Sequence, residues 1–451
     1  MEYDVIIAAC VFLTLAVFGN LLLRCIVNPI TVFCTVWGVI LLAYSFHAYG
    51  LYYASSLSLS LIVVGVSLFF FGAVVAMILF RRNSNSHGRI TVIDENAAGM
   101  NYTVMLLLNI ISFAFLIGFG LSAIRDLLSG SDFYYIHKMY NDEEGMIAGS
   151  KTYRNMITWF VWPLLDASLA AMAASILCDK ENTSKKKKLF IILTLLNLAL
   201  FIIISGKRLR LLNVVMFFIA VFYLQGRRVK LKGRTKLAIA VGLVATLWAF
   251  NYISVGRGTQ SIVRSLYVYL VGCVPHLSSK LSGTVNPKGL TSVYGFFQPI
   301  LIIVNSVFHS STLNSIRNSM SDLAAYTQVR TTIGPGMTFN AFLTPFYFFY
   351  LDGGVIGNVV LSFLFGFFSM GVYYYHIKKR SYQSLLLYLL VFFSLYMSMV
   401  RIQFFQMRYV LSFAYTFLFF IKPKVKIVFQ KGRFQDHVNA FNGEHRFDMR
   451  R

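Results

Sequence analysis

The feature that most constrains this chain is a series of long apolar runs, each bounded by polar or basic residues. Hydrophobic residues make up 57% of the sequence and charged residues only 13%. A helical run of about 20 apolar residues matches the thickness of a bilayer's hydrocarbon core. No stretch outside the runs is apolar enough to build a separate core. The sequence therefore predicts an all-α fold, a polytopic integral membrane protein with about eleven transmembrane helices.

The length of each run and its polar flanks place the predicted spans. They cover residues 5–27, 30–48, 57–80, 101–123, 156–178, 189–205, 211–225, 237–254, 354–375, 384–402 and 404–421. The first run lacks the basic start of a cleavable signal peptide, so we expect it to be retained as the first membrane helix.

The basic residues indicate how these spans are oriented. Lys and Arg number 41 against 17 Asp and Glu, a net charge of +24. The excess gathers in short clusters at Arg81-Arg82, Lys185–Lys188, Arg227–Lys236, Lys378–Arg380 and Lys422–Lys426. With the spans above, all of these clusters fall on one side, which the positive-inside rule makes cytoplasmic. The N-terminus is then outside and the basic tail 422–451 is cytoplasmic, so the charge does not call for a nucleic-acid partner.

The predicted transmembrane domain, residues 1–421, carries two outward segments longer than a hairpin. The long one covers about 254–340 and includes the semi-apolar stretch YGFFQPILIIVNSVF, which we expect to lie along the membrane surface or dip into it. The shorter one covers about 123–155. The five cysteines show no CxxC spacing and the histidines no HExxH spacing, so we expect no disulfide framework, metal site or cofactor.

Several cations lie where this topology does not require them. They are Lys207, Arg208, Arg210, Arg257, Arg264, Arg330, Arg401 and Arg408, at outward span ends or in the long outward segment. Any single one could snorkel to the lipid headgroups. Several that converge from different helix ends favour an anionic ligand, because the planar guanidinium suits bidentate contact with phosphate oxygens. A phosphate or pyrophosphate on a membrane-embedded carrier is the natural candidate.

Acids and histidines give a weaker signal. Asp352, Asp322 and His309 are the candidates for a base that takes a proton from an attacking hydroxyl. Capping of a helix is the more common role for an acid placed like Asp352, which precedes two glycines. Asp166 lies inside the fifth span, and we expect it to pair with another helix through an arginine.

The layout and three short motifs resemble a known family. The motifs are Ser205-Gly206-Lys207-Arg208, Arg257-Gly258, and Asn340-Ala341-Phe342-Leu343 followed by Gly354 and Gly357. Together with the long outward loop between the later spans, they are similar to the Wzy-type oligosaccharide repeat-unit polymerases of the O-antigen polymerase and ligase superfamily. The resemblance covers nearly the whole chain in layout.

The resemblance implies a metal-independent glycosyltransferase without a cofactor in the bacterial cytoplasmic (inner) membrane. Such enzymes join lipid-linked oligosaccharide repeat units, a donor and an acceptor each carried on undecaprenyl diphosphate, into O-antigen or capsule at the outer face. A chain-length regulator and a flippase are the expected protein partners. Carried over to this chain, Arg208 and Arg257 are the first candidates to bind the pyrophosphate. Arg210, Arg264, Arg330 and Arg408 support them without a motif match.

Two other functions stay open. O-antigen ligases place a histidine before the motif asparagine, and this chain has Phe339 there, which favours a polymerase. A flippase or transporter of lipid-linked oligosaccharide would also need outward cations. Such transporters usually show internal repeats, and we detect none in this sequence.

Overall fold

The computed structural model describes residues 2–81, 93, 99–131, 135–136, 139, 150–179, 184–205, 209–225, 233, 262–283, 291–339 and 343–421. The chain divides into one unit from Met1 to Phe420 and a second from Ile421 to Arg451. Every helix and strand below belongs to the first unit. The predicted span 237–254 and the tail 422–451 lie outside the described residues.

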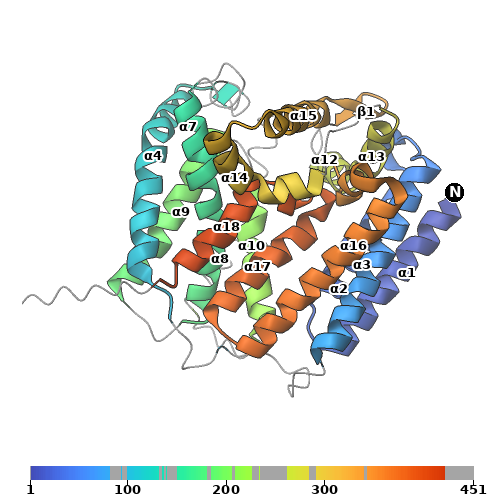
Figure 1. Ribbon diagram of the computed structural model, residues 1–451, viewed down its shortest axis with the longest axis horizontal. Helices are drawn as coiled ribbons and strands as arrows, with labels where there is room; N and C mark the ends of the chain where they lie inside the picture. Colours follow the sequence, from blue (N-terminus) through green and yellow to red (C-terminus); the bar gives the residue numbers. More distant parts are fainter. Residues whose placement is uncertain are drawn as a thin grey trace, which may run out of the picture. The chain divides into compact units, whose positions relative to one another are not determined.

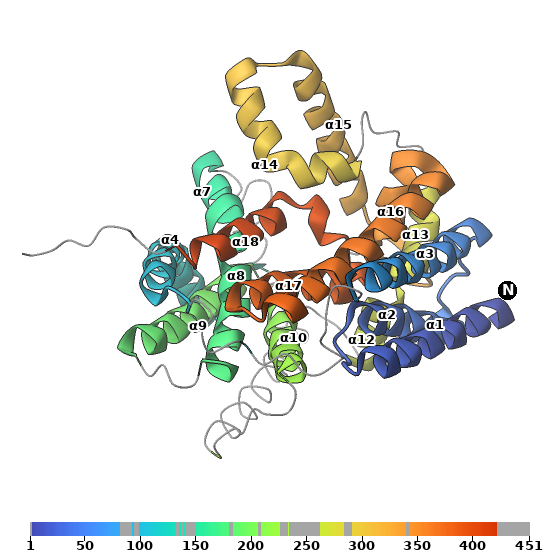
Figure 2. The same cartoon turned by 60° about the horizontal axis from the view of Figure 1, so that its bottom comes forward.

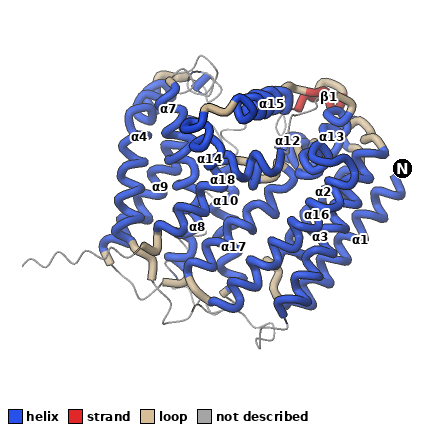
Figure 3. Tube along the Cα trace, in the orientation of Figure 1, coloured by secondary structure: helices blue, strands red, loops and turns tan. Residues whose placement is uncertain are grey.

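The first unit is built almost entirely of helices (Figure 1), and Figure 3 marks its one short hairpin of strands. In chain order the elements are α1 Glu2–Leu23, α2 Pro29–Ser45, η1 Ala48–Gly50, α3 Ser56–Arg81, α4 Tyr102–Leu128, α7 Lys151–Met156, the π-helical segment η2 Ile157–Val161, α8 Trp162–Leu177, α9 Lys185–Ser205, α10 Leu209–Leu224, α12 Ile262–Val271, α13 Cys273–Leu281, α14 Thr291–Phe308, α15 Ser311–Gln328, β1 Thr331–Gly334, β2 Met337–Phe339, α16 Pro345–Lys379, α17 Tyr382–Tyr396, η3 Met397–Met399, η4 Gln403–Phe405 and α18 Met407–Leu418.

The helices are those of an all-α membrane protein. Among the described residues, seven helical stretches are long and apolar enough to cross a bilayer: Tyr3–Leu23, Ser56–Arg81, Tyr102–Leu128, Thr152–Leu177, Lys185–Ser205, Pro345–Lys379 and Tyr382–Met399. The predicted spans at 30–48 and 211–225 form the shorter apolar helices α2 and α10. Large apolar side chains such as Ile7, Leu107 and Ile356 are exposed on the outer helices, where lipid would cover them.

Two of the later spans differ from their predicted form. The last predicted span, 404–421, is divided into η4 and the short α18. The ninth, predicted at 354–375, begins earlier, at Pro345, and bends at Gly353 and Gly354. Gly354 has a φ of +62°, a left-handed conformation that glycine adopts at little cost. The glycines therefore kink a continuous apolar helix, and the predicted start of the span at residue 354 is wrong.

Close packing between α3 and α16 depends on two glycines. A Cβ atom on Gly72 of α3 would collide with the Phe363 carbonyl of α16, and one on Gly366 of α16 would collide with the Phe69 carbonyl of α3. Phe69 and Phe365 also meet edge to face, with ring centroids 5.3 Å apart. The two backbones can approach this closely only because neither glycine has a side chain.

The long outward segment predicted at about 254–340 contains α12 to α15 and the β1–β2 hairpin, and Figure 1 shows α13, α14, α15 and β1 along one end of the long helices. Two buried side chains of α13 bind the other parts of this segment. The Lys280 ammonium donates to the carbonyl oxygens of Tyr326 (2.7 Å) and Val329 (3.0 Å). His276 Nδ1 lies 2.5 Å from the Thr331 hydroxyl, and its ring meets Phe339 edge to face.

We expect Gly72→Ala to lower the free energy of unfolding by about 1–3 kcal/mol, because the added methyl group must push two backbones apart. Thermal unfolding of the detergent-solubilised protein measures the effect. Gly371→Ala in α16 is the matched control, since its Cβ would meet only a Phe80 ring carbon at 3.4 Å. Equal stability of the two variants would show that the close approach of α3 and α16 is wrong.

We expect the hairpin to loosen in acid. Burial, and then the nearby Lys280 ammonium, lower the pKa of His276 to about 4. An unfolded histidine titrates near pH 6.5, so the unfolded state binds more protons as the pH falls from about 6.5 to 4. The stabilisation is complete above about pH 6.5 and is lost through that window. Amide hydrogen exchange in β1 and β2, corrected for its intrinsic pH dependence, should quicken there, and His276→Asn should abolish the change.

Candidate functional site

Three of the cations that the sequence analysis singled out, Arg210, Arg401 and Arg408, belong to segments around the place where α8, α10, α17 and α18 pack against one another (Figure 2). Arg210 of α10 forms an ion pair with Asp166 of α8. Both are buried, with 6% of Arg210 and 3% of Asp166 exposed. The sequence-based prediction that Asp166 pairs with an arginine of another helix is confirmed. Because breaking a buried ion pair leaves an uncompensated charge, this contact fixes α10 against α8.

Aromatic rings hold the guanidinium groups in place. The Arg408 guanidinium carbon of α18 lies 3.4 Å from the centroid of the Trp162 ring. The Arg210 guanidinium carbon lies 5.1 Å from the same ring and 5.1 Å from the ring of Phe201. The π-face of an aromatic ring attracts a cation most strongly where water is excluded. Trp162 thus brings two arginines together that would otherwise repel each other.

A third arginine completes what we call the arginine cluster, made of Arg210, Arg401 and Arg408 around Asp166. Arg408 interacts electrostatically with Arg401, Arg210 and Asp166. Asp166 interacts with Arg210 and Arg408, and Arg401 interacts with Arg408, so these three guanidinium groups and one carboxylate together have two net positive charges. Arg210 is buried and Arg401 and Arg408 are half-buried, and charges removed from water are stable only when paired, so this excess of positive charge is suited to an anion.

Irregular backbone positions the cluster. The chain leaves helical geometry between η3 and η4, at Arg401, and continues into α18, where the Arg408 guanidinium stacks on Trp162 of α8. At membrane depth such backbone is tolerated only inside protein or beside a polar cavity. On the other side, the π-helical segment η2 ends directly before Trp162. Single π-helical turns occur frequently at functional sites.

Two tyrosines interact electrostatically with the Asp166 carboxylate. The Tyr396 hydroxyl donates to Asn213 Oδ1 at 2.9 Å, and Tyr396 also interacts electrostatically with both Asp166 and Arg210. Tyr409 interacts with Asp166 in the same way. These side chains come from α10, α17 and α18, so the cluster joins three helices to α8. The Tyr396 and Tyr409 hydroxyls donate to Asn213 Oδ1 and to the Leu390 carbonyl, so the groups that the site offers to phosphate oxygens are the guanidinium forks.

Six arginines were predicted to bind pyrophosphate, and the structure brings two of them together. Arg210 and Arg408 both belong to the arginine cluster. Arg264 lies on α12, where its guanidinium carbon is 5.9 Å from the centroid of the Tyr49 ring. Arg330 is exposed just before β1. Arg208 and Arg257, the two motif arginines, lie outside the described residues, as does the motif residue Asn340.

The three predicted bases lie on α16, on α15 and between α14 and α15. Asp352 of α16 accepts hydrogen bonds from the backbone N–H and the hydroxyl of Thr291, each at 2.5 Å, at the first residue of α14. It therefore caps a helix, although that helix is α14 and not the one Asp352 belongs to. Asp322 is exposed on α15, and His309 is exposed between α14 and α15 with a φ of +47°. The motif glycines Gly354 and Gly357 shape the bend of α16, where a Cβ on Gly357 would meet the Phe349 carbonyl.

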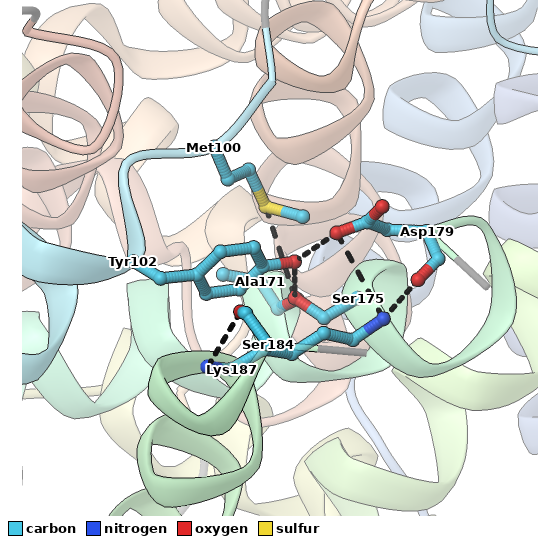
Figure 4. Close-up of polar contacts among 7 residues, drawn as sticks. All are labelled: Met100, Tyr102, Ala171, Ser175, Asp179, Ser184 and Lys187. Carbon is cyan, nitrogen blue, oxygen red and sulfur yellow. Dashed lines mark hydrogen bonds and ion pairs between the residues drawn. The ribbon is translucent and has the colours of Figure 1, made fainter. Parts of the chain in front are cut away.

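A second polar cluster, at the other end of α4, α8 and α9, serves as a comparison (Figure 4). The Tyr102 hydroxyl bonds to Asp179 Oδ2 (2.5 Å) and to Ser175 Oγ (3.1 Å). Lys187 lies 3.8 Å from the same carboxylate oxygen and also donates to the Asp179 carbonyl. One cation balances one anion here, so this cluster needs no ligand, and its contacts hold α4, α8 and α9 together. The arginine cluster has no such balance.

Two residues of the site were not assigned from the sequence. Trp162 was missed, although it lies four residues before Asp166 and so shares one face of α8 with it. Arg401 was named among the cations that the topology does not require, without a role.

The chain matches no protein-family model, no curated protein and no solved structure. The site must therefore be interpreted from its own chemistry.

We expect Asp166→Asn to destabilise the protein by about 3–5 kcal/mol, because it leaves Arg210 buried without its partner. Inorganic pyrophosphate should raise the melting temperature of this variant more than that of the native protein, since the added anion replaces the lost carboxylate. Asp322→Asn, at an exposed carboxylate, is the control. A variant as stable as the native protein, with no response to pyrophosphate, would contradict the assigned role of Asp166.

Proposed function

We propose that this protein polymerises undecaprenyl-diphosphate-linked oligosaccharide repeat units into a surface polysaccharide at the outer face of the bacterial cytoplasmic membrane. The observation that carries the proposal is the charge of the arginine cluster. A sugar–lipid diphosphate is a diester with two negative charges at neutral pH, and the cluster has two net positive charges among the described residues. The family resemblance of the sequence leads to the same ligand by a separate route.

The proposed reaction is a glycosyl transfer. A hydroxyl of the acceptor unit attacks the anomeric carbon of the donor glycan, a new glycosidic bond forms, and the bond from that carbon to the diphosphate oxygen breaks. The hydroxyl proton passes to a base, and undecaprenyl diphosphate leaves. Negative charge grows on the leaving diphosphate in the transition state, so fixed guanidinium groups there would lower the barrier. Arg210, Arg401 and Arg408 take that role.

The proposal includes an orientation. The predicted topology puts the N-terminus and the segment from α12 to β2 outside, and the tail after Lys422 in the cytoplasm. In that topology the arginine cluster belongs to the outward half of the helices, because Arg210 lies in the first turn of α10, at its predicted outward end. A lipid-linked substrate in the outer leaflet would reach the cluster without crossing the bilayer.

Ligation of a finished glycan to another acceptor is the second candidate, because the same leaving group and the same cluster would serve it. Phe339, at the position where ligases carry histidine, favours polymerisation. Export of the lipid-linked unit is the third. Deletion of the gene separates all three by gel analysis of surface polysaccharide. Single repeat units on the surface anchor indicate a lost polymerase, long unattached chains a lost ligase, and lipid-linked units that accumulate without any outward glycan a lost flippase.

We expect Arg408→Gln and Arg401→Gln each to slow polymerisation by about 10²–10³-fold, the usual cost of removing one donor from a charge-stabilising site. Surface polysaccharide should shift from long chains to single units at a normal protein level. Arg408→Lys should retain part of the activity, because it keeps the charge and loses the planar fork. Arg317→Gln, at an exposed arginine of α15, is the control. Unchanged chain length in both cluster variants would refute the site assignment.

A further inference from the structure

The helix α14 exposes a stripe of large apolar side chains. Phe296, Ile300, Ile303 and Val307 follow one another at intervals of four, three and four residues, so they lie on one face of the helix. Their exposed fraction rises from 41% at Phe296 to 66% at Val307, because α14 leaves the protein interior toward its C-terminal end. The helix contains no charged residue. Apolar surface of this extent marks a place where a membrane or another molecule covers the protein.

The next helix, α15, has the opposite character. Figure 2 shows α14 and α15 as a hairpin that projects from the other helices, and the Asn305 amide closes the hairpin by donating to Asn314 Oδ1 at 2.7 Å. The exposed residues Asn314, Asn318 and Ser321 lie on one face of α15. One helix of the hairpin therefore exposes apolar side chains and the other polar ones. Such a division is typical of helical segments that lie in a membrane interface.

The contact between α14 and α16 indicates the depth at which α14 begins. Thr291, the first residue of α14, donates to Asp352 of α16 through its backbone N–H and its hydroxyl. At its other end α16 carries Lys378 and Lys379, which must lie outside the hydrocarbon core. Positions 352 and 378 differ by 26 residues, and a helix of that length spans about 39 Å. Because a bilayer with its headgroups is about 40–45 Å thick, α14 begins in the headgroup region of the opposite leaflet.

The buried face of α14 packs against the segment that carries two arginines of the cluster. A Cβ atom on Gly295 would meet the Phe405 Cα at 2.6 Å, so α14 and η4 touch backbone to backbone. The Phe405 ring also meets the ring of Phe349 of α16 edge to face, with centroids 6.0 Å apart. The segment η4 lies between Arg401 and Arg408. The position of α14 therefore constrains the backbone that connects these arginines.

We propose that α14 lies in the plane of the membrane with its apolar stripe in the acyl chains, and that this contact with lipid holds η4 and the arginine cluster in position. The leaflet is the one at this end of the helices, which is the outer leaflet in the predicted topology. Of the two placements expected for this stretch from the sequence, the proposal takes the one along the membrane surface. It does not rest on the proposed function, because it holds for any ligand of the cluster.

Lipid fits the stripe better than a protein partner does. The apolar side chains continue to Phe308 at the tip of the hairpin without a charged residue. Protein interfaces normally surround an apolar centre with a polar rim, whereas acyl chains need no such rim.

The first measurement tests for contact with lipid. Ile303→Trp places a tryptophan in the stripe, and Asn318→Trp places one on the polar face of α15 as the matched control. The full-length variants are reconstituted in nanodiscs of brominated or unbrominated phospholipid, and the fluorescence of the native protein, with its four tryptophans, is subtracted. Bromine quenches only tryptophans that reach the acyl chains. The added fluorescence of Ile303→Trp should be mostly lost in brominated lipid, and that of Asn318→Trp should be retained.

The second measurement tests whether the lipid contact holds η4. Ile300→Asp combined with Ile303→Asp puts two carboxylates into the stripe, which should drive α14 out of the acyl chains. Amide hydrogen exchange in Gln403–Phe405 should then quicken by about tenfold. Asn318→Asp combined with Ser321→Asp adds the same charge to the exposed face of α15 and should leave this exchange unchanged. Exchange in α1, which packs against α2 and α3, reports whether the fold is intact, and Ile303→Asp alone replaces the double variant if it is not.

Each part of the proposal can fail separately. Equal quenching of the two added tryptophans would overturn the placement in lipid, and so would a lack of quenching at Ile303→Trp, because a second copy or another protein then covers the stripe. Quenching at Ile303→Trp with unchanged exchange in η4 would overturn the role of α14 in holding the cluster. Neither measurement uses a diphosphate, so failure of the proposed function would leave both results valid.

Discussion

The arrangement of the helices around the arginine cluster depends on the buried ion pair between Arg210 and Asp166, which keeps a guanidinium group charged away from water. Moving a guanidinium group out of water costs several kcal/mol even after the protein relaxes, and only a close counter-charge offsets it. Asp166 supplies that counter-charge for Arg210 and shares it with Arg408. The cation–π contacts of Trp162 supply part of the rest. The positive charge that remains uncompensated is the basis of the proposed anion site.

The surrounding helices make this arrangement rigid. α8 is buried along nearly its whole length. Polar contacts that follow Asp166 along α8 fix its position against α4 and α9. Asn109 of α4 donates to Ser168 of α8 at 3.0 Å, and Asn197 of α9 donates to the Asn109 carbonyl, also at 3.0 Å. The clamp of Tyr102 with Asp179 closes the far end. A charge site needs such support, because a shift of one ångström in a guanidinium group would lose its bidentate geometry.

The sequence predicted those parts of the molecule that follow from the bilayer itself. Long apolar runs had to become helices, and a carboxylate within one of them had to find a cation, as Asp166 does. It could not predict which arginines would meet, because that depends on a break in helical structure at Arg401 and on how α10 packs. Asp352 shows what the sequence alone does not specify. Its glycine neighbours indicated that it caps a helix, but only the fold shows that this helix is α14, which begins much earlier in the sequence. Which acid would meet a bound substrate depends on the same factor, since proximity in a membrane bundle is set by packing between helices.

The most direct test of the central claim is a cryo-electron microscopy structure of the protein in nanodiscs with undecaprenyl diphosphate. The account predicts density for the diphosphate in contact with the guanidinium groups of Arg210, Arg401 and Arg408, beside the Trp162 ring. A diphosphate bound elsewhere on the protein, with the arginine cluster empty and closed around Asp166, would contradict it.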